Sequence, residues 1–432
     1  MRRSTWSELD ERERDAVFAP PPASETIRAA AVEIVETIRR EGSKAVFEYA
    51  RRFDGYDGND FRVPAAEIEA AVLKTAREDI AAMQMAIGAV RKFHAGQGLP
   101  DCDVETWPGV KCRRRVDPLS SAGLYVPAGS APLASTLIML AVPAQIAGVR
   151  DIAVVVPPQP DGRVNAAVLA AASLLGIENV FAIGGAQAIG ALAFGAAGLP
   201  KVAKIFGPGN AWVAAAKSHV STLAGGPAID LPAGPSEVMV IADADARADF
   251  VAADLLAQAE HDPLAQVVLV SLGADMTAIE TQLDRQLAGL PRREIASAAL
   301  DNGLIIAAAD RDAAVEIANR GCPEHLILQT AEPGGIASKV LTAGSIFLGP
   351  WTPESMGDYA AGPNHTLPTG GAGRAWSGVT VEAFQRTTTL IEASEAGAKA
   401  ISPTVERLAQ LEGLEAHRNA MALRTNGGRD EG

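Results

Sequence analysis

Two short stretches decide the fold that this sequence predicts: VFAIGGAQ at residues 180–187 and KIFGPGN at residues 204–210. In each, a short apolar run ends at glycines and is followed by a run of helix-forming residues. A β-branched strand, a glycine turn and a helix, repeated along the chain, are typical of parallel βαβ units. The run IAVVV at residues 152–156 begins another such unit. We therefore predict a parallel α/β domain over residues 118–235.

A second strand–helix series begins at residue 236. Its predicted strands are Glu237–Ile241, Gln266–Val270, Gly303–Ala307, Leu326–Gln329 and Ser345–Leu348, separated by helices near 246–260, 274–288 and 311–320. Apolar residues at helical spacing also predict helices within 25–52 and 64–95. Residues 100–118 are polar and irregular, which indicates a short strand pair or a linker.

These elements predict an α/β protein with two tandem parallel-sheet domains and small helical extensions at both ends. Both domains are Rossmann-like, but neither carries the G-x-G-x-x-G fingerprint. The predicted division is an N-terminal arm at 1–20, a first α/β domain formed by 21–117 with 236–368, a second at 118–235, and a C-terminal helical tail at 369–432. We expect the tail to end in one helix over Pro403–Leu423.

Composition limits the class of protein. The chain has 432 residues, 48% of them hydrophobic and 21% charged, as in a folded enzyme. Its net charge of −14 argues against a nucleic-acid partner. Charged or helix-breaking residues interrupt every apolar run before the roughly 18–20 residues of a membrane span, and the N-terminal residues MRRSTWSELD lack the apolar core of a secretory signal. Three scattered cysteines form no disulfide framework, so we expect a cytoplasmic protein.

Gln258 and His261 form a candidate half-site for a metal. They lie three residues apart at the end of a predicted helix that Pro263 stops, so they share one helix face. The alternative is a solvated polar pair at a helix end. Asp358 or His365, in the Gly- and Pro-rich stretch after the predicted strand 345–348, could complete a metal site, because ligand residues often lie in such loops.

Glu324 and His325 form a second candidate site. Pro323 keeps the preceding residue out of a helix, so the pair lies on an extended edge, where a carboxylate and an imidazole can act as two general bases. The alternative is a surface polar pair. Cys322 is close enough to be considered as a nucleophile, but a buried, inert thiol is the interpretation we adopt.

The two glycine turns are candidates for nucleotide binding. A turn of this kind presents backbone N–H groups at a helix N-terminus, where phosphates bind. Gln187 and Asn210 are amides at the mouths of the two turns, where they could reach the hydroxyl groups of a ligand. The alternative, close packing of helix on strand, explains the same glycines.

Taken together, these residues carry a resemblance to the histidinol dehydrogenase family over nearly the whole chain. The matching segments are FDG (53–55), GLYVPAGSAPL (123–133), GGAQA (184–188), GPGNAWVAAAK (207–217), DLPAGPSEV (230–238), AQAEHD (257–262), PEHL (323–326), GDY (357–359), GPNHTLPT (362–369) and EGLEAH (412–417). So many matches in one order are far more specific than any single motif.

The resemblance implies a zinc enzyme that oxidises L-histidinol to L-histidine with two NAD⁺, through L-histidinal. It implies Glu324 and His325 as catalytic bases. It implies one zinc ion per subunit, with the ligands Gln258, His261, Asp358 and His417. The implied substrate contacts are Ser236, His325, Glu412 and the four zinc ligands, and the implied NAD contacts are Tyr125, Gln187 and Asn210. It also implies a homodimer in which the tail of one chain, bearing Glu412 and His417, completes the site of the other.

Two other functions fit parts of the sequence. A paralogue could oxidise another polar alcohol, such as a sulfonated diol. Glu412 and His417 argue against it, since the resemblance assigns them to an amino-imidazole substrate. A non-catalytic nucleotide-binding regulator could keep the α/β scaffold, but the intact Glu324-His325 pair argues against that.

Overall fold

The computed structural model describes residues 1–19, 24–128, 133–232 and 234–425. Parts of two matching segments, residues 129–132 and Ala233, therefore lie outside the described residues, as do the last residues of the predicted tail, 426–432. The chain forms two compact units. One contains Met1–Gly96 and Ser120–Phe384, and the other contains Gln97–Leu119 and Gln385–Gly432.

The first unit contains a five-stranded parallel sheet, as the strand–glycine–helix pattern predicts. Its strand order is β6-β5-β4-β7-β8. The strands are β4 (Ser121–Tyr125), β5 (Asp151–Val156), β6 (Val180–Ala182), β7 (Lys204–Phe206) and β8 (Ala228–Ile229). The helices between them are α6 (Ala134–Ala147), α7 (Ala166–Leu174), α8 (Gly185–Phe194) and α9 (Ala211–Thr222). The order reverses between β4 and β7, and the crevice at the carboxyl ends of two such strands is where open α/β sheets bind ligands.

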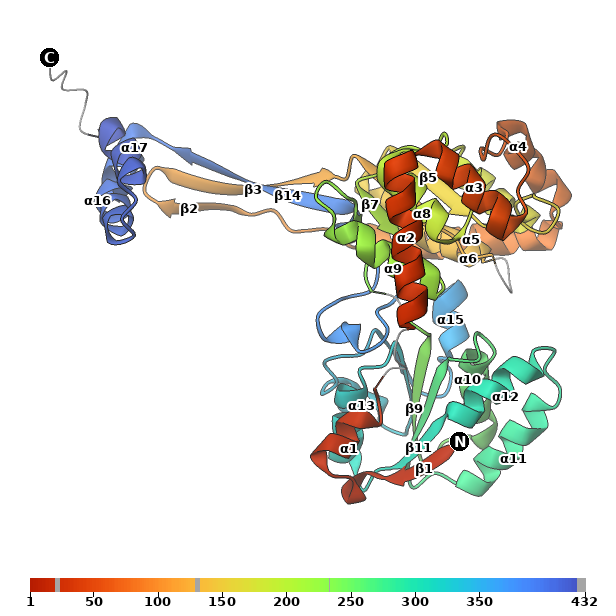
Figure 1. Ribbon diagram of the computed structural model, residues 1–432. Helices are drawn as coiled ribbons and strands as arrows, with labels where there is room; N and C mark the ends of the chain where they lie inside the picture. Colours follow the sequence, from red (N-terminus) through yellow and green to blue (C-terminus); the bar gives the residue numbers. More distant parts are fainter. Residues whose placement is uncertain (20–23, 129–132, 233, 426–432) are drawn as a thin grey trace, which may run out of the picture. The chain divides into compact units, whose positions relative to one another are not determined.

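The same unit contains a six-stranded parallel sheet in the order β1-β11-β10-β9-β12-β13 (Figure 1). The strands are β1 (Arg2–Thr5), β9 (Glu237–Asp243), β10 (Gln266–Leu272), β11 (Leu304–Ala307), β12 (His325–Gln329) and β13 (Ser345–Leu348). Its helices are α10 (Ala248–Ala259), α11 (Met276–Leu287), α12 (Arg293–Asn302), α13 (Arg311–Gly321), α14 (Pro333–Ala337) and α15 (Glu354–Tyr359). The predicted pair of parallel sheets is confirmed.

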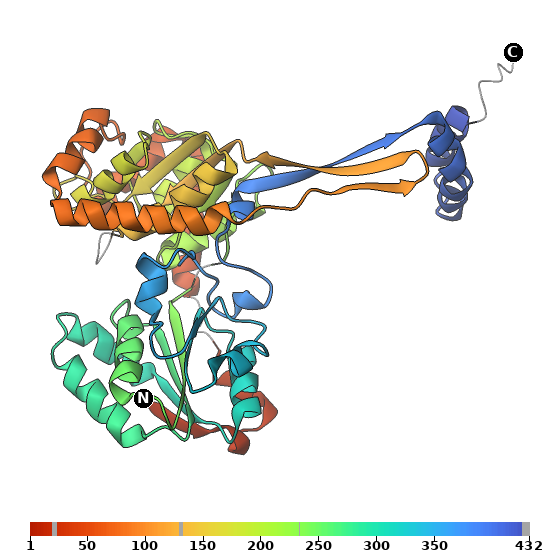
Figure 2. The same ribbon diagram turned by 180° about the vertical axis from the view of Figure 1, so that it is seen from behind.

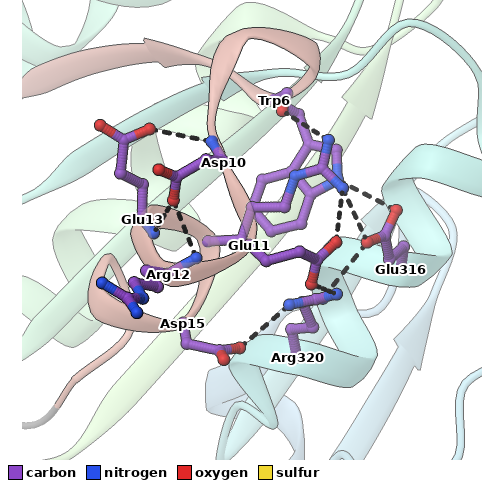
Figure 3. Close-up of polar contacts among 9 residues, drawn as sticks. Trp6, Asp10, Glu11, Arg12, Glu13, Asp15, Glu316 and Arg320 are labelled. Carbon is purple, nitrogen blue, oxygen red and sulfur yellow. Dashed lines mark hydrogen bonds and ion pairs between the residues drawn. The ribbon is translucent and has the colours of Figure 1, made fainter.

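The N-terminal arm is part of the six-stranded layer rather than a separate extension. Its first residues form the edge strand β1, and η1 (Trp6–Glu8) and α1 (Glu11–Ala16) follow. Figure 3 shows this segment beside α13: Trp6 Nε1 donates to Glu316 at 3.1 Å, and Arg320 pairs with Asp15 at 3.0 Å and with Glu11. The sequence did not indicate this strand, because four residues at a sheet edge carry almost no pattern of their own.

The helices between residues 25 and 95 are α2 (Glu25–Glu41), α3 (Ser43–Asp54), α4 (Ala65–Lys74) and α5 (Arg77–Ala95). We expected this region to join the domain of residues 236–368, but the structure places it on the five-stranded sheet. Ile34, Val35 and Ile38 of α2 share a core with β4, β5, α8 and α9. Gly190 of α8 makes room for α2, since a Cβ there would lie 2.9 Å from Ile38 Cδ1. An apolar face in the sequence predicts that a helix packs against other elements, but it does not tell which sheet the helix packs on.

The second unit is a three-stranded antiparallel ribbon followed by two helices (Figure 2). The ribbon contains β2 (Asp103–Trp107), β3 (Val110–Pro118) and β14 (Gln385–Ala393), in the order β14-β3-β2. The strand pair expected within 100–118 is therefore confirmed, whereas β14 was not predicted. The expected single helix over Pro403–Leu423 is wrong. The chain forms α16 (Glu395–Leu411) and α17 (Glu415–Thr425), separated near Gly413, whose φ of +69° ends a helix.

No helix within the described ranges is long and apolar enough to span a membrane.

Candidate active site

The predicted bases lie at the amino edge of the six-stranded sheet, opposite the edge at which such sheets usually bind ligands. His325 is the first residue of β12, and Ser236 directly precedes the neighbouring strand β9. Helix α10 connects the carboxyl end of β9 to the amino end of β10, so its C-terminal end, with Gln258 and His261, returns to this same edge.

Glu324 and His325 are both buried and held by one residue of β9. The backbone N–H of Glu237 donates to Glu324 Oε2 at 3.0 Å. His325 Nδ1 lies 3.2 Å from the carbonyl oxygen of Glu237. A carbonyl only accepts, so this bond requires the proton on Nδ1 and leaves Nε2 free to accept one. Because Glu324 and His325 are 6% and 4% exposed, the alternative of a surface polar pair is wrong.

Three carboxylates surround the His325 ring. Glu324 Oε2 lies 3.7 Å and Glu354 Oε1 3.8 Å from Nδ1, and Asp358 Oδ1 lies 3.6 Å from Nε2. Glu354 and Asp358 come from the short helix α15, where residues four apart share one face. Glu354 is buried, and it was not among the predicted site residues. Its spacing from Asp358 was the available signal, but a helix of this length within a Gly- and Pro-rich stretch is hard to predict.

The electrostatics follow from this crowding. Burial raises the pKa of Glu324 to about 7 and that of Glu354 to about 8. Burial alone would lower the pKa of His325, but the nearby Glu324 and Glu354 carboxylates outweigh it and raise that pKa to about 10. For Asp358, burial acts to raise the pKa, but the nearby His325 ring lowers it overall. The site therefore gathers acceptor groups in poorly solvated surroundings, which favours a bound cation.

The donors fit a zinc ion. One ligand atom each from His261, Glu354 and Asp358 lie within 4.8 Å of one another. Gln258 is completely buried, and neither its amide oxygen nor its amide nitrogen has a hydrogen-bond partner among the described residues. An unsatisfied buried amide is costly, so the amide oxygen of Gln258 is a candidate further donor to an ion held at this site. Imidazole nitrogens with carboxylate and amide oxygens suit zinc.

A pocket extends from Glu324 toward the five-stranded sheet. Its lining includes Ser236, Glu324 and His365 on one side and Gly207 and Asp230, which follow β7 and β8, on the other. His365 connects the two sides: Nδ1 lies 3.0 Å from the carbonyl oxygen of Asp358, and Nε2 lies 3.3 Å from Thr136 Oγ1 on α6. The amino edge of one sheet thus faces the carboxyl edge of the other across this pocket.

The predicted NAD contacts lie at the carboxyl edge of the five-stranded sheet. Tyr125 ends β4, Gln187 is in the first turn of α8, and Asn210 caps α9. Tyr125 Oη accepts the N–H of Gly185 at 3.2 Å, and Gln187 Nε2 donates to Asp54 at 2.8 Å, so both buried side chains already have protein partners. Asn210 is exposed.

The glycine turn after β7 brings the backbone close to the end of β4. Gly207 has a φ of +113°, and a Cβ there would lie 2.1 Å from the carbonyl oxygen of Tyr125. Only glycine allows this approach. The carboxyl ends of β4 and β7 therefore lie close together, at the point where the strand order reverses, and Asn210 caps the helix that follows β7.

Cys322 has the environment of a structural thiol. It is buried at the end of α13 with a φ of +48°, and its Sγ donates to the carbonyl oxygen of Thr342 at 2.8 Å. Burial raises its pKa, which disfavours the thiolate that a nucleophile requires.

Comparison with known proteins identifies the family. The model of the family "Histidinol dehydrogenase" matches residues 20–425. This chain belongs to the histidinol dehydrogenase family. It is 48% identical to a histidinol dehydrogenase of Xylella fastidiosa over 98% of this chain and 99% of that protein. It is 46% identical to that of Escherichia coli K12, over 96% and 95% of the two chains.

A solved histidinol dehydrogenase structure agrees with the fold. The crystal structure of the enzyme from Elizabethkingia anophelis superposes with a TM-score of 0.93 at 41% identity and covers 99% of this chain and 98% of that one. As a member of the histidinol dehydrogenase family, the chain is an enzyme and an oxidoreductase. The resemblance seen in the sequence is therefore confirmed.

Two predicted site residues lie in the second unit. Glu412 directly follows α16, and His417 lies on α17, and both are exposed within that unit. The predicted bases, metal ligands and substrate contacts of the first unit all lie at the amino edge of the six-stranded sheet: Ser236, Gln258, His261, Glu324, His325 and Asp358.

Proposed function

We propose that this enzyme oxidises L-histidinol to L-histidine through L-histidinal, with NAD⁺ as the oxidant, in histidine biosynthesis. The observation that carries the proposal is the buried Glu324–His325 pair, of which Glu324 lines a pocket that also reaches the carboxyl edge of the five-stranded sheet. The relatives from Xylella fastidiosa and Escherichia coli are named histidinol dehydrogenases.

The two bases have separate roles. His325 Nε2 takes the proton from the substrate hydroxyl, because Nδ1 is held by the carbonyl of Glu237. This role requires a neutral ring, and a cation held by the surrounding carboxylates would oppose the rise that they cause in the pKa of His325. Glu324 takes a proton from the water that hydrates the aldehyde. Its burial raises its pKa to about 7, so the carboxylate is basic enough for this step near neutral pH. His325 then takes the hydroxyl proton of the hydrate in the second oxidation.

The proposed zinc ligands are Gln258, His261 and Asp358 of one chain and His417 of the tail. Zinc, when bound, would hold the imidazole and amino nitrogens of the substrate and so orient it. Glu354 lies among these donors and either joins them or accepts a hydrogen bond from the substrate. Ser236 and Glu412 are the further substrate contacts we propose, with His325 and the zinc ligands.

NAD⁺, when bound, supplies the hydride acceptor. We propose that Asn210 contacts it directly from the mouth of the β4–β7 crevice, and that Tyr125 and Gln187 line the same crevice. Their hydrogen bonds to Gly185 and Asp54 hold the glycine turn and the end of α3 in place around it.

The experiment that tests the catalytic assignment separates the two half-reactions. Glu324→Gln should slow the oxidation of L-histidinal about 10²–10⁴-fold, the typical contribution of one acid–base group, and slow the oxidation of L-histidinol much less. NADH formation is measured with each substrate, and circular dichroism checks the fold. Equal loss in both half-reactions would contradict the assignment of the water to Glu324.

We propose a homodimer in which the tail of each chain completes the site of its partner. His417→Ala and His261→Ala proteins should each be inactive. When they are unfolded together and refolded, random pairing gives half mixed dimers with one intact site each, so activity should return to roughly a quarter of the wild-type level. If the mixture stays inactive while wild-type protein refolds normally, the tail serves its own chain.

A further inference from the structure

Glu237, at the start of β9, connects both proposed bases to a distant loop. Its backbone N–H donates to Glu324 Oε2 at 3.0 Å, and its carbonyl accepts from His325 Nδ1 at 3.2 Å. Its side chain is buried, with the residue 6% exposed. The side-chain atom Oε1 accepts the N–H of Gly370 at 2.8 Å, across a sequence separation of 133 residues.

The loop that Glu237 holds forms one wall of the pocket. Thr366, Leu367 and Thr369 line the pocket together with Ser236 and Glu324. Thr369 Oγ1 accepts the N–H of Gly234 at 2.6 Å, so the loop is tied to the segment 234–237 by two hydrogen bonds.

The backbone of this loop turns sharply directly after the contact. Gly370 and Gly371 have φ values of +62° and +76°, which residues with a Cβ rarely adopt. Two consecutive glycines give a segment with little intrinsic stiffness. The position of Thr369 in the pocket wall therefore depends on what the neighbouring N–H of Gly370 binds.

The buried carboxylate of Glu237 is unfavourable unless it accepts a hydrogen bond. Burial raises its pKa to about 7, and the N–H group of Gly370 acts in the opposite direction. A buried acceptor must be hydrogen-bonded to offset its desolvation. The donor is the N–H of Gly370, which belongs to the pocket wall. The hydrogen bond that offsets the desolvation of Glu237 is therefore the same one that holds the wall in position.

We propose that Glu237 is a positioning residue for the oxidation. By the reach of its side chain it fixes the loop Thr366–Gly371 against the amino edge of the sheet, while its main chain holds Glu324 and His325 at the same place. This inference rests on the proposed function, because it takes Glu324 and His325 as the bases.

Two variants separate the reach of the side chain from its charge. Glu237→Asp keeps the carboxylate but withdraws it from Gly370 by one methylene. Its kcat with L-histidinol should fall about 10–100-fold, the scale of a roughly 1 Å misplacement, while KM changes by no more than about threefold. Glu237→Gln keeps an oxygen at the original reach, and its kcat should stay within about threefold of wild type.

A matched control variant tests whether a loss of stability alone would lower kcat. Ile306 is buried on β11 of the same sheet and lines no part of the pocket. Ile306→Ala should lower the melting temperature at least as much as Glu237→Asp, yet leave kcat within about threefold of wild type.

The inference is overturned if Glu237→Asp has wild-type kcat, if Glu237→Gln loses as much as Glu237→Asp, or if Ile306→Ala loses kcat to the same extent. Glu324→Gln and His325→Gln, assayed in parallel, distinguish the two levels of the argument. If both keep wild-type kcat for L-histidinol and L-histidinal, the proposed function and this inference fail together. If they are impaired while Glu237→Asp is not, only the positioning role fails.

Discussion

Replacing Lys217 by methionine should destabilise the enzyme strongly, because it leaves a buried negative charge. Lys217 and Asp230 form an ion pair at 2.5 Å, with side chains that are 2% and 1% exposed. Lys217 Nζ also donates to the carbonyl oxygen of Gly207 at 2.7 Å. Asp230 accepts the N–H groups of Gly207 and Leu231 at 2.6 and 2.8 Å. Lys217 thus binds the carbonyl oxygen of Gly207 and Asp230 binds its N–H group, so the pair holds the turn after β7.

The loss of free energy of unfolding in Lys217→Met follows from the groups that stay buried after the substitution. Methionine fills most of the lysine volume, so the cavity contribution is small. The loss is two charge-assisted hydrogen bonds of about 1.5–3 kcal/mol each, which agrees with the about 3–5 kcal/mol for breaking a buried ion pair on one side. In Lys217→Met/Asp230→Asn the charge is removed, but an amide oxygen can still accept from the backbone. The double variant should therefore recover at least about 1–2 kcal/mol relative to the single one.

Urea unfolding followed by tryptophan fluorescence measures both differences, with Trp212 on α9 as a nearby reporter. The reasoning is refuted if Lys217→Met costs less than about 1 kcal/mol, the value of an exposed pair. It is equally refuted if the double variant is no more stable than the single one.

Three further outcomes test other parts of the structure. Removing the metal with a chelator should abolish the oxidation of L-histidinol and zinc should restore it; full activity in protein shown by elemental analysis to be metal-free would exclude the proposed site. Cys322→Ala should keep activity within about threefold, because the thiol is buried and bonded to Thr342; a covalent substrate adduct trapped on Cys322 would overturn this. Burial raises the pKa of Asp54 in the folded state, against the hydrogen bond from Gln187, so the native state binds more protons than the unfolded state and the wild-type free energy of unfolding falls as the pH rises above the ordinary aspartate pKa of about 4. Asp54→Asn should accordingly gain stability relative to wild type as the pH rises from about 4, and a difference in urea midpoint that does not change with pH would contradict it.

The sequence by itself determined the two parallel sheets and several features of the site. Strands such as 152–156 and 204–206 are recognisable because buried parallel strands are largely apolar runs, and here Pro157 and Gly207 mark their ends. The buried thiol of Cys322 was also predicted, and in the structure burial outweighs the nearby Arg374, which acts to lower its pKa. The other proposed site residues, such as Ser236, Glu412 and His417, came from the family resemblance, because no local pattern marks them.

Only the tertiary structure decided which elements meet. The strand Gln385–Ala393 pairs with Val110–Pro118, far away in sequence, and helix α2 packs on the sheet formed by residues 121–229 rather than on the sheet that follows. It also brought Glu354 and Glu237 beside His325, at the amino edge of a sheet where ligand sites are not expected. The physical reason is that a periodic pattern records whether a residue is buried, which depends on its immediate neighbours along the chain. Which surface buries it depends on contacts between segments whose separation in sequence leaves no local trace.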